Sequence, residues 1–482
     1  MNPDRRRSVR IVLYNLALLT LSVSVAFAPS IVHAQLAQEK ELGEEFVKAA
    51  RRGFPMTTDY ELESLVDDLG GRIVATLKDN NFDYEFFVVR ADDINAFAVP
   101  GGKVFVHSGL VARAESEDEL ASVLGHEVAH AHAHHIIRQQ QKSAPINYAS
   151  LLGIFLGIVH PLLGQAALAA GQAAQLRYQR DFEREADYLG VRYARDAGFD
   201  PGAMMHLLRK IYAEQQLNPT SIPPYFLSHP LSGERLTNLE AVLGRNEWDG
   251  EALPASMRLQ RARAVARAVA QTREQVVPDY ERQLALATPE ERPQALELIG
   301  VMMTHGEDWM LAEGYLEQAR DAGRSVDREL GRVYLRRGKF DEARPLLEAA
   351  VKASEGDWNA LADLGTLDYQ QGRFVDAQRR LEKSFELDPW RPEVVRSLGR
   401  TFGKAGNPGA GFYWFGRASE IQGDFEGALG YFRKAADQLS DDDPLATKAN
   451  EKVETLTEEL DGNPPIPKVG RRLSWPRAQE LW

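Results

Sequence analysis

Residues 116–138 read SEDELASVLGHEVAHAHAHHIIR. Ser116 and Glu119 have the spacing of a capping box, so we expect a helix to begin there and to run to about Arg138. This helix would carry His126-Glu127-Val128-Ala129-His130, in which the two histidines are one turn apart and face the same point. The spacing predicts that both imidazoles bind a single zinc ion.

Glu127 lies about 100° around the helix from His126, where its carboxylate reaches a water molecule on the open position of such an ion. Zinc lowers the pKa of that water to about 7, and a carboxylate beside it acts as general base in amide hydrolysis. The pentapeptide alone is moderately specific. A pair of surface histidines without a metal is the alternative interpretation.

A second charged run offers a third ligand. Glu183 and Asp187 are four residues apart in RDFEREAD, residues 180–187, and would share one face of a helix. The glutamate is suited to bind zinc, and the aspartate to hold a ligand histidine through its other ring nitrogen. A solvated charged helix explains the same run equally well. The long pattern with a third histidine is excluded, because its positions are occupied by Ala133 and Ile136.

These motifs, in this order, resemble the peptidase family that includes HtpX and the CAAX prenyl protease. Two flanking segments extend the resemblance. NAFAVPGGK at 95–103, with SGL at 108–110, precedes the histidine helix, and SHP at 228–230 is followed by Arg235. With the leader and the repeats described below, the resemblance covers nearly all of the mature chain.

The resemblance implies a zincin-like metallopeptidase with one Zn²⁺ ion per chain. The implied zinc ligands are His126, His130 and Glu183. Glu127 would be the general base. Asp187 would hold a ligand histidine through the ring nitrogen that does not bind zinc. His229 and Arg235 would stabilise the oxyanion of the tetrahedral intermediate. Without the resemblance, His229 reads as a loop histidine before a proline.

Phe86–Val89 and Lys103–His107 have the pattern of short strands, separated by the turn Pro100-Gly101-Gly102. The resemblance implies that the substrate-binding residues Val104, Phe105 and Val106 form an edge strand, which pairs with an extended substrate backbone.

Three further histidines crowd the motif: His132, His134 and His135. We interpret His134, one turn beyond His130, as an exposed residue. A competing ligand or a metal-entry site is the alternative.

The first 34 residues have the pattern of a cleaved signal peptide. Arginines precede the uncharged run Ile11–Ala28, and Val32-His33-Ala34 matches a cleavage site. An uncleaved membrane anchor is the alternative. The absence of cysteine excludes a disulfide framework and a lipid-anchor cysteine. We therefore expect a periplasmic protein.

The 70 acidic residues outnumber the 57 basic ones, for a formal net charge of −13. Such a charge repels nucleic acid and anionic lipid surfaces. We therefore expect no nucleic-acid partner and at most peripheral contact with a membrane.

Residues 143–176 hold no charged side chain apart from a possible charge on His160. The apolar part, Ala149–Val159, would be about 16 Å long as a helix and is broken by Pro161, so it is too short to cross a bilayer. We expect a helical hairpin or lid over the catalytic domain. A membrane-touching element is the alternative.

From about Ala255 onward the chain has a helical pattern with a period of 34 residues. The repeated features are Leu-Gly at 330–331, 364–365 and 398–399, and Gly338, Gly372 and Gly406. This period and this order are typical of tetratricopeptide repeats. Atypical copies at both ends are expected to cap the stack.

We therefore expect an α+β chain that is mainly α. Its predicted parts are a signal peptide (1–34), a zinc metallopeptidase domain with a small β-sheet (35–250), an α-solenoid of tetratricopeptide repeats (251–460) and a Pro-rich tail (461–482).

Taken together, the leader, the repeats and the resemblance imply an exported zinc metalloendopeptidase that degrades misfolded or misassembled envelope proteins, in outer-membrane protein quality control. Its repeats would bind substrates or the outer-membrane assembly machinery. The alternative is a periplasmic chaperone or scaffold of an outer-membrane assembly complex with minor or latent protease activity. In a latent enzyme, residues 143–176 would cover the cleft and His229 would occupy the open position of the zinc until substrate arrives.

Overall fold

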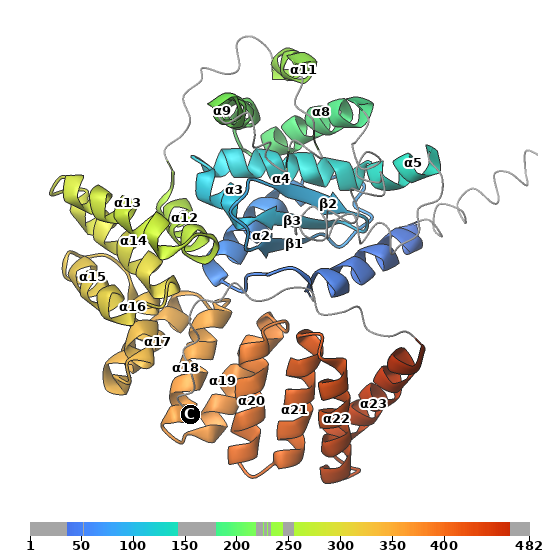
Figure 1. Cartoon of the computed structure of the whole chain (residues 1–482), viewed down its shortest axis with the longest axis vertical. Helices are drawn as coiled ribbons and strands as arrows, with labels where there is room; N and C mark the ends of the chain where they lie inside the picture. The colour runs from blue at the N-terminus through green and yellow to red at the C-terminus, as the bar shows by residue number, and fades with distance from the viewer. Residues whose placement is uncertain are drawn as a thin grey trace, which may run out of the picture.

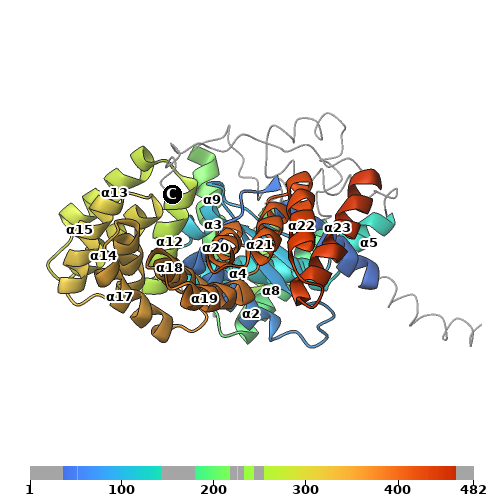
Figure 2. The same ribbon diagram turned by 90° about the horizontal axis from the view of Figure 1, so that it is seen from below.

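The computed structural model describes residues 36–51, 53–142, 180–217, 225, 229, 233–243 and 255–462. The expected signal peptide, the uncharged segment 143–176 and the tail beyond residue 462 lie outside the described residues. A helix-rich domain with a small sheet is followed by helical hairpins that curve beneath it (Figures 1 and 2).

The sheet has three strands in the order β1-β3-β2. β1 (Glu85–Val89) pairs parallel with β3 (Lys103–His107), and β2 (Ala96–Val99) pairs antiparallel with β3. The turn between β2 and β3 contains Gly101 and Gly102 at φ +80° and +78°, a backbone conformation that favours glycine. Both predicted strands are present, and β2 was missed because its four residues are small or apolar without alternation in polarity.

The prediction that Val104–Val106 form an edge strand is wrong. β3 is the central strand, with partners on both sides, and these three side chains are completely buried. The outer strands are β1 and β2. The free side of β1 is engaged by the preceding segment, since Thr57 N donates to Val88 O (2.9 Å) and Arg90 N to Pro55 O (2.8 Å).

Both faces of the sheet are covered. Because side chains alternate along a strand, Val104 and Val106 join the core beneath α2 (Tyr60–Val74) and α4 (Glu117–His132), whereas Phe105 points to the opposite face. There it packs with Phe46 and Phe97 under the helix at residues 36–51. The sheet is thus a rigid layer behind the histidine helix.

Three helices lie on the far side of α4 from the sheet (Figure 1): α8 (Arg180–Asp196), α9 (Ala203–Leu217) and α11 (Gly233–Leu243). The short helix α3 (Ser108–Arg113) directly follows β3, and α5 (His135–Lys142) follows the end of α4. In the described part of the chain, no helix combines the length and the apolar character needed to cross a membrane.

The predicted start of the histidine helix is confirmed, but its end is earlier than expected. Ser116 is the N-cap of α4 and its hydroxyl accepts the Glu119 N–H (3.1 Å). The helix ends at His132 rather than Arg138, because His134 adopts a left-handed conformation (φ 53°) and α5 begins at His135.

The helices from residue 257 onward form the predicted solenoid. They are α12 (Met257–Ala270), α13 (Arg273–Leu286), α14 (Arg292–His305), α15 (Trp309–Asp321), α16 (Asp327–Arg336), α17 (Phe340–Ala353), α18 (Trp358–Gln370), α19 (Phe374–Leu387), α20 (Pro392–Lys404), α21 (Pro408–Ile421), α22 (Phe425–Gln438) and α23 (Pro444–Gly462).

The repeated glycines have two physical roles. Gly338, Gly372 and Gly406 follow helix ends with φ between +73° and +93°. The glycine of each Leu-Gly pair permits close packing of two helices, since a Cβ at Gly331 or Gly365 would come within 2.9 Å of the leucine on the next helix.

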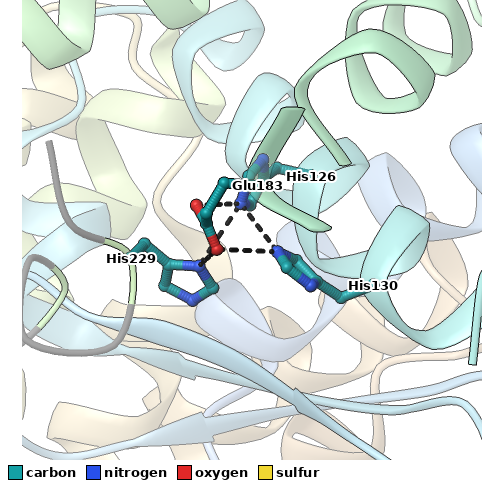
Figure 3. Close-up of side chains that lie close together, drawn as sticks. All are labelled: His126, His130, Glu183 and His229. Carbon is teal, nitrogen blue, oxygen red and sulfur yellow. Dashed lines mark hydrogen bonds and ion pairs between the residues drawn. The ribbon is translucent and has the colours of Figure 1, made fainter. Parts of the chain in front are cut away.

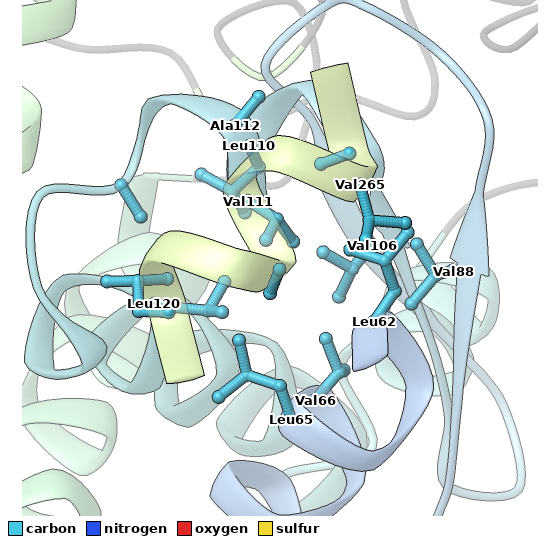
Figure 4. Packing of buried hydrophobic residues seen from close by; sticks show 14 of the residues in the cluster. Leu62, Leu65, Val66, Val88, Val106, Leu110, Val111, Ala112, Leu120 and Val265 are labelled. Carbon is cyan, nitrogen blue, oxygen red and sulfur yellow. The ribbon is translucent and has the colours of Figure 1, made fainter. Parts of the chain in front are cut away.

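The first solenoid helix belongs to the core of the preceding domain. Leu259, Ala262 and Val265 of α12 are completely buried, and Val265 packs in one cluster with Leu62 and Val111 (Figure 4). That cluster continues through the repeats as far as Leu367 in α18. A second cluster holds α20 to α23 together.

Candidate metal centre

The two histidines of the predicted motif lie on the buried face of α4. His126 Nε2 and His130 Nε2 are 3.0 Å apart, and both side chains are almost completely buried. The capped start of α4 and its position between the sheet and α8 hold the two rings in place.

α8 brings the second charged run to the same place. Glu183 Oε1 lies 3.4 Å from His130 Nε2, and Glu183 Oε2 lies 3.6 Å from His126 Nε2. The close approach depends on Gly190, where a Cβ would lie 2.9 Å from the backbone N and Cα of His126. Of the two interpretations of this run, the structure contradicts the solvated helix, because Glu183 and Asp187 are each only 4% exposed.

His229 joins this group from a third segment. Its Nδ1 lies 3.0 Å from Glu183 Oε1 and 3.4 Å from His126 Nε2, and it is completely buried. Figure 3 shows His126, His130, Glu183 and His229 converging on one point. The ring of Tyr225 stacks on the His229 imidazole, with centroids 4.8 Å apart.

These four side chains form a donor set that fits zinc. Each offers one nitrogen or oxygen atom, and these atoms all lie within 4.8 Å of one another. Bonds of about 2.0–2.2 Å in a tetrahedron place ligand atoms about 3.3 Å apart. The observed separations of 3.0–3.6 Å match that value. Imidazole nitrogens and carboxylate oxygens are both common zinc ligands.

Asp187 and Arg235 lie directly behind the donors. Asp187 Oδ1 is 3.0 Å from His126 Nδ1, the ring nitrogen that faces away from the other donors. Arg235, on α11, donates from Nε and Nη2 to the two oxygens of Asp187 at 2.8 and 2.9 Å. Its Nη1 is 2.9 Å from Glu183 Oε2. In this geometry the guanidinium is directed at the two carboxylates, and its predicted role at an oxyanion stays a prediction.

Glu127 is held between the sheet and the donors. Its Oε2 accepts the Ala98 N–H of β2 (3.1 Å), and its Oε1 lies 3.5 Å from His229 Nε2. Oε1 is buried and has no hydrogen-bond partner. A carboxylate oxygen left in this way beside the donor set is placed to exchange a proton with a molecule that enters the site.

Burial and neighbouring charges shift the pKa values of the site in opposite directions. Burial raises the pKa of Glu127, although His229 and His126 oppose this. Burial alone would raise the pKa of Glu183, but His229 and Arg235 hold it well below its usual range. Burial would lower the pKa of His126, but Asp187 and Glu183 raise it to about 9. Asp187 and Glu183 therefore favour positive charge at His126.

The three additional histidines have separate partners. His132 Nδ1 lies 2.6 Å from the Tyr193 hydroxyl, and His134 Nδ1 lies 2.9 Å from Glu39 Oε2. The His134 side chain is 28% exposed, so it is half-buried rather than exposed as predicted, and its ion-pair partner is Glu39. His135 is completely buried, and its Nδ1 lies 2.9 Å from His130 Nδ1. The sequence does not distinguish His135 from His132 and His134, because in a continuous helix the His135 side chain would point away from His130.

Comparison with known proteins agrees with this geometry. The family model described as Peptidase family M48 matches residues 57–243, and two tetratricopeptide-repeat models match residues 304–357 and 334–407.

Among curated relatives, the chain is 30% identical to the beta-barrel assembly-enhancing protease of Escherichia coli (strain K12), over 77% of this chain and 71% of that protein. It is 36% identical to the protein of the same name from Yersinia pestis, over 42% of this chain and 43% of that protein. It is 32% identical to the mitochondrial metalloendopeptidase OMA1 of Schizosaccharomyces pombe, over 38% of this chain and 51% of that protein.

Proposed function

Because this chain belongs to peptidase family M48 and is a metalloendopeptidase with tetratricopeptide repeats, we propose that it is an exported, zinc-dependent enzyme that degrades misfolded or misassembled envelope proteins. The single observation that carries the zinc assignment is the convergence of His126, His130 and Glu183, with Glu127 beside them. The leader and the relatives named for β-barrel assembly support a role in the periplasm, in outer-membrane protein quality control.

In this proposal His126, His130 and Glu183 hold one Zn²⁺ ion, which supplies Lewis acidity for activating water and polarising the scissile carbonyl. Glu127 takes a proton at Oε1 from the attacking water and returns it to the leaving amine. Asp187 orients His126 through Nδ1, and Arg235 holds Asp187 and Glu183 in place.

The correction to the sheet order moves the proposed substrate-binding edge from β3 to β2. Ala98 N, which donates to Glu127 Oε2, points away from β3. An extended polypeptide pairing along that side of β2 would pass directly beside Glu127, once it displaces the groups that keep Ala96–Val99 at most 2% exposed. Recognition through backbone groups suits a protease that accepts unfolded segments of varied sequence.

Zinc content and casein digestion test this proposal, measured on the chain from Gln35 and on its Glu127→Gln variant. We expect one zinc ion per chain in both proteins and digestion only by the wild type, because glutamine retains the shape of the side chain but accepts no proton. A folded wild type without zinc would contradict the assignment.

The position of His229 supports a latent resting state, which is part of the alternative function. Its Nδ1 lies among the donor atoms, where it would take the position that substrate or water needs. We propose that His229 is a displaceable fourth ligand. The His229→Ala variant should then keep its zinc and digest casein faster than the wild type. A slower variant with full zinc content would instead favour the predicted oxyanion role.

The repeats are the proposed binding surface for substrates or for the outer-membrane assembly machinery. Stacked helical hairpins form extended concave surfaces that bind polypeptide segments. If the chaperone function dominates, Glu127→Gln will retain the envelope phenotype of the wild type, and a chain with a disrupted repeat surface will lose it.

A further inference from the structure

The break between α4 and α5 places a fifth histidine against the donor set. A continued helix would direct residue 135 away from His130, since five residues correspond to about 140° of rotation. Instead, His134 takes φ 53°, which breaks the helix, and His135 begins a new helix. The imidazoles of His130 and His135 then meet edge to face, with centroids 4.8 Å apart.

The contact involves the ring nitrogen of His130 that does not face the other donors. His135 Nδ1 lies 2.9 Å from His130 Nδ1. Figure 3 shows the second nitrogen of His130 on the side away from Glu183. His126 has the corresponding contact with Asp187, at 3.0 Å. Both histidines of the motif therefore have a polar partner behind them, but the partner of His130 is an imidazole.

The His135 ring is itself held in place. It stacks on Phe182, with centroids 4.6 Å apart and an interplanar angle of 16°. Its Nε2 lies 3.2 Å from Glu185 Oε2, without the alignment of a full hydrogen bond. Arg138 Nη1 donates to the same oxygen of Glu185 (2.9 Å) and to Ala133 O (3.1 Å).

These contacts determine which ring nitrogen of His130 and of His135 carries the proton. A metal ligand must present a bare Nε2, so His130 carries its proton on Nδ1 and donates it to His135 Nδ1. His135 therefore carries its own proton on Nε2, which faces Glu185. The carboxylate at the end of this chain makes each imidazole before it a better electron donor.

We propose that His135 and Glu185 are positioning residues that hold His130 in the tautomer and orientation required to bind zinc. This inference rests on the proposed function, because it assumes that His130 is a zinc ligand. It assigns a role to a histidine that sequence spacing left aside and to Glu185, which lies between the two acidic residues already placed in the site.

Zinc affinity, measured by competition with a chelator, tests the proposal on wild type, His135→Gln, Glu185→Gln and His134→Asn. We expect a loss of about 10- to 100-fold for His135→Gln. Glu185→Gln should lose about threefold to tenfold, because the amide oxygen still accepts a hydrogen bond but carries no charge. His134→Asn is the control, since asparagine also adopts the left-handed conformation of this position and its side chain removes only the contact with Glu39. It should bind zinc as the wild type does.

The visible absorption spectrum of bound Co²⁺ provides a second measurement, since it reports the coordination geometry rather than the stability of the fold. It should change in His135→Gln and remain unchanged in His134→Asn. A folded His135→Gln with wild-type affinity and spectrum would overturn the proposal. If that variant does not fold, Glu185→Gln decides, because its side chain is 39% exposed and its replacement leaves the packing intact.

The zinc site and the role of His135 and Glu185 can be overturned separately. A wild type that binds no zinc overturns the proposed function and this inference with it. A wild type that binds zinc, with variants of equal affinity, overturns only the role of His135 and Glu185.

Discussion

At the scale of single residues, the side chains of the metal centre are buried, although most of them are ionisable. Burial of a lone charge costs several kcal/mol, so each group needs a partner of opposite charge or a metal. Arg235 is cationic, and it contacts both Asp187 and Glu183. The histidine donors face these carboxylates from the other side. Without a metal ion, Arg235 and a protonated His126 together offset the charges of Asp187 and Glu183.

Asp187→Asn should weaken zinc binding by about 10- to 100-fold. The amide removes the charge opposite Arg235 and places an NH₂ group toward either the guanidinium or His126 Nδ1. Competition with a chelator measures the effect. Asp196→Asn is the control on the same helix, since Asp196 is exposed and has only a 3.8 Å contact with Arg192. Equal affinities in the two variants would argue against a supporting role for Asp187.

At the scale of elements, the distance between α4 and α8 decides whether the donors meet. The two helices approach through glycine, since Gly125 and Gly190 face each other without side chains. A larger residue at either position would separate Glu183 from the histidines of α4.

Gly190→Ala should lower both the stability and the zinc affinity. Its Cβ would lie 2.9 Å from two backbone atoms of His126, which no side-chain rotation can relieve. Overpacking of this kind costs about 1–3 kcal/mol. Gly314→Ala is the control, because nothing lies within 4 Å of its Cβ, and it should gain about 0.5–1 kcal/mol. Urea denaturation and zinc titration measure the two effects, and a Gly190→Ala variant as stable as Gly314→Ala would refute this explanation.

At the scale of the whole molecule, a buried ionic network joins the peptidase domain to the solenoid. The Arg261 guanidinium of α12 contacts Glu61 of α2 (2.8 Å), Glu297 of α14 (2.6 Å) and Glu329 of α16 (2.5 Å). Nearby, Tyr60 packs edge to face on Trp358 of α18, with centroids 4.9 Å apart. These contacts and the shared core make the first repeats a rigid extension of the peptidase domain.

Glu329→Gln should destabilise the chain by about 1–3 kcal/mol at pH 7, because it removes a buried carboxylate that binds both Arg261 and Arg328 and leaves Glu61 as their shared partner. Burial alone would raise the pKa of Glu329, but these arginines hold it well below its usual range. The contribution of a carboxylate with a lowered pKa is complete above its unfolded value of about 4.3 and is lost as the pH falls below it.

The difference in urea midpoint between the wild type and Glu329→Gln should therefore shrink as the pH falls from 7 to 3. Asp376→Asn is the control, since Asp376 pairs with Arg379 at the exposed surface, and it should change stability by less than about 1 kcal/mol at either pH. A pH-independent difference for Glu329→Gln would show that its charge is not what stabilises the contact.

Two truncated chains test where the boundary between the structural units lies. A chain that ends after Asn246 lacks α12 and uncovers the completely buried surface around Leu62 and Val111, so it should aggregate. A chain that ends after Asp388 keeps the first core cluster, which reaches Leu367, and should remain soluble and bind zinc. Size-exclusion chromatography with metal analysis distinguishes the two, and a monomeric folded product from the shorter chain would contradict the continuous core.

The sequence by itself determined the features that depend on local spacing. Helix periodicity placed His126 beside His130, and Glu183 one turn from Asp187. The 34-residue period revealed the solenoid, because each repeat must bury the same face against its neighbours.

Only the tertiary structure decided which distant segments meet. It placed β3 at the centre of the sheet, brought His229 among the donors, turned His135 back onto His130 and put α12 into the core of the peptidase domain. The physical reason is that these contacts depend on how whole elements pack and on single backbone angles, such as the left-handed conformation of His134. The spacing of residues along a helix or strand determines neither the packing of whole elements nor such backbone angles.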